Sequence, residues 1–137
     1  MSVALQIEPP ANPADAPAEA PANAPTPELD WLDVCALAEI PVACGVAALL
    51  RGRQIALIRP AGDEVVFALS NYDPFSEAFV IARGIVGDAA GRLKIASPIY
   101  KQSFDLETGA CLDDPMVRLP VYPVRVRAGR VEVGLQP

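Results

Sequence analysis

The chain has 137 residues, a net charge of −6, three cysteines and no histidine, and this size fits one domain with a tail. The acidic balance argues against nucleic-acid binding, which needs a basic face, and the lack of histidine excludes histidine-based acid–base catalysis and histidine-containing triads. No apolar run reaches the roughly 20 residues of a membrane span and no signal peptide is recognisable, so we expect a cytoplasmic protein with reduced thiols and no membrane contact.

Residues 1–28 form a segment rich in proline and alanine and without basic side chains. Proline removes a backbone donor and fixes φ, which disfavours both helix and sheet. We therefore expect a disordered arm, partly in the polyproline II conformation. Its composition fits either a solvated spacer or a docking arm for a partner.

The folded domain is expected over residues 29–137, and its pattern is one of short strands. Strands are predicted, in chain order, at residues 31–37, 45–50, 54–59, 64–69, 92–96, 121–127 and 130–135. The second and third form a hairpin around Gly52, and the last two form a hairpin around Ala128-Gly129 whose valines should share one face. A glycine-rich turn is predicted over residues 83–91 and a weak helical turn within 74–82. Short strands with frequent turns indicate an all-β antiparallel sandwich or small barrel.

Two proline-centred loops are the most informative feature. They read Y-D-P-F-S at residues 72–76 and S-P-I-Y-K at residues 97–101, and F-D-L and T-G follow at 104–106 and 108–109. Together these motifs resemble those of Rieske domains, in which C-P-H and C-P-x-H loops precede F-D-L and T-G. The chain is more specifically similar to the small subunits of NAD(P)H-dependent assimilatory nitrite reductases, with Y-D-P-F-S, R-G-I-V-G-D and S-P-x-Y-K-Q in the same order. The likeness spans residues 30 to 135.

This resemblance implies that Asp73, Phe75, Ser97 and Tyr100 stand at the four ligand positions of a Rieske centre. It places Asp73 near Ser97, where a hydroxyl can donate to a carboxylate, and Phe75 near Tyr100, where two rings can pack. A Rieske centre requires two cysteines and two histidines, and two oxygen ligands are too few for Mg²⁺ or Ca²⁺. We therefore expect no metal and no cofactor in this chain. The resemblance implies that FAD, an iron–sulfur cluster and sirohaem are carried by the partner, the large subunit of the reductase.

The aromatic and basic residues around the loops have two readings. The rings either fill the tip of the domain or form an aromatic contact for a partner, and the cations are either solvated or pair with acidic groups. The candidate partner contacts are Tyr72, Phe79, Arg83 and Lys101. Cys35, Cys44 and Cys111 are interpreted as small core residues rather than reactive thiols.

The resemblance implies an accessory role in an oxidoreductase. The chain would be the non-catalytic small subunit of a cytoplasmic complex that reduces nitrite to ammonium with NADH or NADPH, and its partner would be the large subunit. The alternative is a redox-inactive β-sandwich module for protein interaction. The protein that co-purifies with the chain would distinguish the two.

Overall fold

In the computed structural model of the chain, residues 28–137 are described, so the arm predicted over residues 1–28 lies almost entirely outside the described part. This part is built from short strands and two 3-10 turns, in agreement with the predicted all-β class. The elements are β1 (Asp30–Ala36), η2 (Leu37–Glu39), β2 (Cys44–Leu50), β3 (Arg53–Arg59), β4 (Phe67–Ser70), β5 (Tyr72–Asp73), β6 (Ala78–Phe79), η3 (Ile81–Arg83), β7 (Ile85–Ala89), β8 (Arg92–Ala96), β9 (Ser103–Asp105), β10 (Val121–Tyr122), β11 (Val124–Arg127) and β12 (Arg130–Leu135). No helix among these residues is long and apolar enough to cross a membrane.

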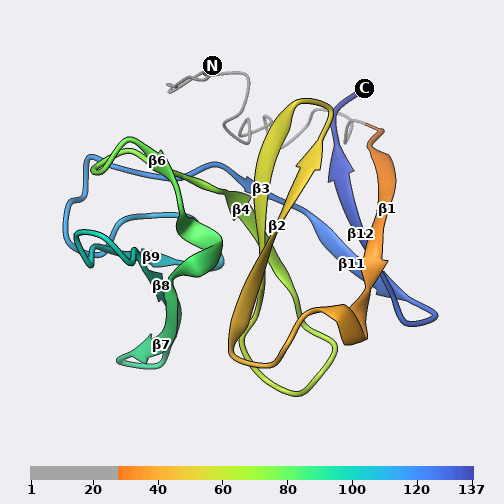
Figure 1. The fold of residues 1–137 in the computed structure, drawn as a ribbon, viewed down its shortest axis with the longest axis horizontal. Coiled ribbons are helices and arrows are strands. Elements are labelled where there is room, and N and C mark those ends of the chain that lie inside the picture. The colour runs from red at the N-terminus through yellow and green to blue at the C-terminus, as the bar shows by residue number, and fades with distance from the viewer. Residues whose placement is uncertain (1–27) are drawn as a thin grey trace, which may run out of the picture.

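The strands form two larger and two smaller antiparallel sheets. The sheet β1-β12-β11 packs against the sheet β10-β4-β3-β2 as an open sandwich, which confirms the sandwich alternative of the predicted fold. The hairpin β5-β6 and the sheet β7-β8-β9 form a separate lobe on the other side of β3 and β4 (Figure 1). The lobe carries both proline-centred loops.

Strand β3 lies between two hydrophobic cores, because its residues 55–58 are all fully buried. Alternate side chains of a strand point to opposite faces. Ile55 and Leu57 therefore join the core of the sandwich, while Ala56 and Ile58 join the core of the lobe. The lobe core attaches the proline-centred loops firmly to the sandwich.

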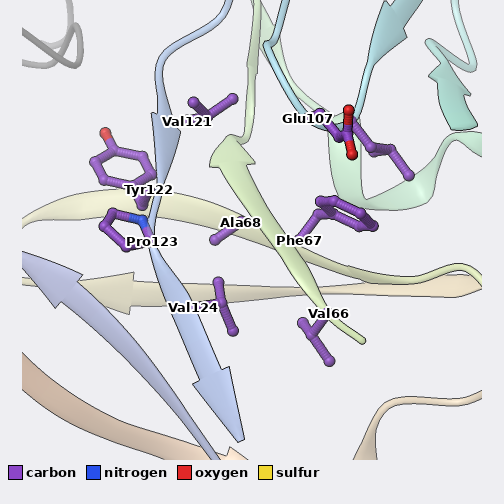
Figure 2. A pocket seen from close by; sticks show the side chains of 9 residues that line it. Val66, Phe67, Ala68, Glu107, Val121, Tyr122, Pro123 and Val124 are labelled. Carbon is purple, nitrogen blue, oxygen red and sulfur yellow. The ribbon is translucent and has the colours of Figure 1, made fainter. Parts of the chain in front are cut away.

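The predicted strand over residues 121–127 is two strands in different sheets. Strand β10 pairs with β4, and β11 pairs with β12. Pro123 stands between them, has no N–H to donate, and accepts a hydrogen bond from the Gly134 N–H at 2.9 Å through its carbonyl. Where the chain changes sheets it leaves a groove beside β4, lined mainly by apolar side chains and by Glu107 (Figure 2).

Two further local predictions are refined by the structure. The weak helical turn expected within 74–82 is present at residues 74–77, where the Glu77 N–H donates to the Asp73 carbonyl, and strand β6 and the 3-10 turn η3 follow it. The glycine-rich segment 83–91 is mostly strand β7, and only Ala90 and Gly91 form the turn, with φ of 52° and 83°. The glycines in this segment serve close packing as well as turning, as the contacts of Gly84 show.

Candidate functional site

The two proline-centred loops meet at the end of the lobe. The first starts at the end of β5 and the second directly after β8. Each loop closes with the same backbone hydrogen bond: the Glu77 N–H donates to the Asp73 carbonyl at 2.7 Å, and the Lys101 N–H donates to the Ser97 carbonyl at 3.1 Å. The two loops are thus built alike, and each begins at one of the predicted site residues.

A buried carboxylate joins the loops. Asp73 and Ser97 are both fully buried, and the Ser97 hydroxyl donates to Asp73 Oδ2 at 2.5 Å. Asp73 Oδ2 also accepts from the Ser76 hydroxyl at 2.7 Å, and Oδ1 accepts from the Phe75 N–H at 2.9 Å. The predicted neighbourhood of Asp73 and Ser97 is therefore present in the structure, although Ser76 was not predicted. The signal for Ser76 was local, since an Asp side chain often binds groups two or three residues on.

The two aromatic ligand positions do not pack on each other. The ring of Phe75 is partly buried against Phe104, with centroids 6.2 Å apart, whereas Tyr100 is 60% exposed. The predicted Phe75–Tyr100 pair is therefore corrected to a Phe75–Phe104 pair. The physical reason is that a phenyl ring gains by entering the apolar core, while a tyrosine hydroxyl can stay in water.

The four candidate contact residues have different surroundings. Tyr72 and Phe79 are cross-strand partners in β5-β6, with ring centroids 5.1 Å apart. Phe79 is 43% exposed, and Tyr72 is less so. Arg83 and Lys101 are exposed, and neither forms an ion pair within the described part of the chain. Phe79, Arg83 and Lys101 are thus accessible to a partner.

A second buried carboxylate lies in the sheet β7-β8-β9 and was not predicted to form a site. Asp105 on β9 accepts from Arg92 Nε at 2.6 Å and from the N–H groups of Glu107 and Thr108 at 2.8 and 3.1 Å. Burial on its own raises the pKa of Asp105, but these backbone donors and the Arg92 guanidinium outweigh it and hold the pKa below its ordinary value of 3.8. This arrangement is structural, because it ties β8 to β9.

The cysteines do not all lie in the core as predicted. Burial raises the pKa of the Cys111 thiol and, together with the nearby Glu39 carboxylate, that of the Cys35 thiol. Cys44 is exposed at the start of the edge strand β2. The described residues contain no group of three or more cysteine, aspartate or glutamate side chains placed to hold a metal ion.

Known proteins resemble this chain over most of its length. The family of the Rieske-like 2Fe-2S domain matches residues 30–134. The nitrite reductase (NADH) small subunit of Escherichia coli strain K12 is 41% identical over 103 residues, which cover 75% of this chain and 95% of that protein. A crystal structure from Mycobacterium tuberculosis, described as an NADH-dependent nitrite reductase small subunit, aligns with a TM-score of 0.76 and 47% identity, covering 80% of this chain and 98% of the other.

A further relative is a much longer protein. The nitrite reductase NAD(P)H large subunit of Klebsiella oxytoca is 44% identical over 110 residues, which are 80% of this chain but only 11% of that protein. A domain like this chain is therefore part of a large-subunit polypeptide in that organism.

The prediction that this chain has no cofactor of its own is wrong for the family, because the matching family is described as a 2Fe-2S domain. The ferredoxin of carbazole 1,9a-dioxygenase from Nocardioides aromaticivorans also shares the fold, with a TM-score of 0.65 and 26% identity over 75% of this chain and 95% of the other. The expectation had rested on the absence of histidine, on the count of three cysteines and on the side chains at the four ligand positions.

The side chains present at the two loops do not fit that group. A Rieske cluster is held by two cysteine thiolates and two histidines, and the chain has no histidine. At the four positions stand a carboxylate, a phenyl ring, a hydroxyl and a phenol. The carboxylate and the hydroxyl are buried and bonded to each other, so the family description and the donor set of this chain disagree.

Proposed function

The chain belongs to the Rieske-like 2Fe-2S domain family and, within it, to the nitrite reductase small subunits, and we propose that it is the accessory, non-catalytic small subunit of a cytoplasmic NAD(P)H-dependent nitrite reductase. The observation that carries the proposal is the similarity to a small subunit across 95% of that protein's length. The substrate and product of the complex would be nitrite and ammonium.

The Klebsiella oxytoca relative supports a large subunit as the partner. In that protein a domain similar to this chain is covalently joined to a large subunit. Covalent linkage keeps two domains at a high effective concentration, which is useful when the domains work in contact. A separate small chain would need a binding surface to achieve the same association.

The geometry of the loops supports an accessory role. General acid–base or nucleophilic chemistry needs a titratable group that can reach a substrate. Asp73 and Ser97 are fully buried and already hydrogen-bonded, and histidine is absent from the sequence. We infer that the loops shape a surface and that nitrite is reduced on the large subunit.

Co-purification tests the proposal. The affinity-tagged chain would be produced together with the nitrite reductase large subunit of its own organism, and we expect both to elute together in a fixed ratio. NADH- and NADPH-dependent loss of nitrite would be measured with and without the small chain. An untagged large subunit that passes through the column would contradict the proposal, and retention of a different protein would favour the interaction-module alternative.

A further inference from the structure

Two exposed aromatic side chains lie in or beside the proline-centred loops. Tyr100, in the second loop, is 60% exposed, and Phe79, on β6 three residues after the first loop, is 43% exposed. Ile99, at 45%, precedes Tyr100 in the second loop. Both loops lie in the lobe on the far side of the molecule from the sheet β1-β12-β11 (Figure 1). Protein interfaces are enriched in aromatic side chains at their centres.

These side chains stand on a rigid base. The carboxylate of Asp73 binds its own loop through Ser76 and Phe75 and the other loop through Ser97. A surface that is held in one conformation before binding loses less conformational entropy when a partner arrives.

The loops also hold charged residues in an unfavourable backbone conformation. Glu77 and Lys101 have φ of 57° and 70°, in the left-handed region that favours glycine. Each lies four residues after a buried anchor, Asp73 or Ser97, and each side chain is exposed. Ala43, Arg51, Ala90 and Ala128 have the same conformation in turns elsewhere in the described chain, so it marks the close of each loop and does not by itself indicate a binding role.

Lys101 adds an exposed positive charge beside these apolar side chains. It lies next to Tyr100 and forms no ion pair with any described residue, although the chain as a whole carries −6. A cation beside exposed apolar side chains is complementary to a partner surface that is apolar and includes a carboxylate. The groove in Figure 2 is different in character, since the only charged residue in its lining is the acidic Glu107.

We infer that Phe79, Ile99, Tyr100 and Lys101 form the surface that binds the large subunit, here called the loop surface. The inference rests on the proposed function, and it specifies which face of the chain makes the contact. The matching patch on the large subunit is apolar and places a carboxylate opposite Lys101. In the Klebsiella oxytoca protein, the equivalent surface would face the rest of the same polypeptide.

Binding to the purified large subunit of the same organism, immobilised for biolayer interferometry, tests this surface. Tyr100→Ala and Lys101→Glu should each weaken the dissociation constant at least tenfold. The effect of Lys101→Glu should shrink as salt is raised, because screening weakens exposed charge pairs. Matched controls are Leu49→Ala, at a side chain 71% exposed on β2, and Arg127→Glu at the β11–β12 turn, both of which should bind like the unaltered chain. Unfolding midpoints would verify that every variant is folded.

The outcomes separate the inference from the proposed function. If the unaltered chain binds and the loop variants bind equally well, the loop surface is wrong and the subunit assignment stands. The same holds if Leu49→Ala or Arg127→Glu weakens binding as strongly as the loop variants. If the unaltered chain fails to bind, both fall together. Loss confined to the loop variants supports both.

Discussion

Asp73 is the residue on which the geometry of both loops depends. A buried carboxylate is costly unless hydrogen bonds replace its water, and Asp73 has three donors, two of them hydroxyls. The donor from Ser97 comes from 24 residues further along the chain. The side chain therefore acts as a connection between two distant segments rather than as a reactive group.

Replacing Asp73 with alanine should destabilise the fold by about 2–4 kcal/mol, because the buried Ser97 hydroxyl, the partly buried Ser76 hydroxyl and one N–H lose their acceptor. Urea unfolding measures the change. Asp33→Ala is the control, since Asp33 makes a surface ion pair with Arg130 and such pairs contribute about 0–1 kcal/mol. A loss at Asp73 no larger than at Asp33 would contradict the role given to the carboxylate.

At the scale of elements, the junction of η3 and β7 fixes where the second loop starts. A Cβ added to Gly84 would lie 2.3 Å from the carbonyl oxygen of Ala96 and 2.8 Å from Cγ1 of Ile95. A backbone carbonyl cannot move aside as a flexible side chain can. The absence of a side chain at Gly84 therefore lets η3 and β7 approach the end of β8, next to Ser97.

Gly84→Ala should destabilise the protein by roughly 2 kcal/mol or more, the usual cost of overpacking a close contact. It should also shift the NMR resonance of the Ser97 amide, because Ala96 must move. The matched control is Gly62→Ala, where an added Cβ meets nothing within 4 Å. An unchanged Ser97 resonance with unchanged stability would show that the contact is relaxed in solution.

The link between β8 and β9 predicts a specific response to acid. The pKa of Asp105 is lower in the folded chain than its ordinary value of 3.8, so the unfolded chain binds more protons between the two values. The stabilisation from Asp105 is thus complete above pH 3.8 and is lost as the pH falls through the folded pKa.

Stability measured by urea unfolding should accordingly decline below about pH 4, and the decline should be shallower in Asp105→Asn. Glu107→Gln is the control in the same loop, because the side chain of Glu107 is exposed. Its acid profile should follow that of the unaltered chain. Identical slopes for Asp105→Asn and the unaltered chain would rule out the proposed role of Asp105.

For the whole molecule, the decisive feature is that β3 belongs to both cores. If either the sandwich or the lobe unfolded and β3 left its place, apolar residues in the core of the other part would also become exposed. Small domains with such shared packing usually unfold in one cooperative step. The loops should therefore share the stability of the sandwich.

Ile95→Ala tests this coupling. Ile95 is fully buried in the lobe core, and its truncation should cost about 2–5 kcal/mol. Trp31 lies in the sandwich on β1, and its fluorescence reports the free energy of unfolding of the sandwich. This free energy should fall by the same amount as the free energy of opening measured by amide hydrogen exchange in β7–β9. An unshifted Trp31 transition would show instead that the lobe unfolds independently.

Several features could be predicted because they are local in the sequence. The alternation of valine with charged residues in 124–127 and 130–135 identifies two strands and their buried face, as the structure confirms. The spacing of the two loops identifies the family, and the absence of histidine is a property of composition alone.

Other features were decided only by the tertiary structure. The change of sheet at Pro123, the turn of Phe75 toward Phe104, and the pairing of Arg92 with Asp105 each depend on segments brought together from a distance. An apolar pattern shows that a residue will be buried, but with two cores on either side of β3 it does not show in which core. Which core a residue joins is decided by the arrangement of all the strands that buries the most apolar surface and forms the most hydrogen bonds.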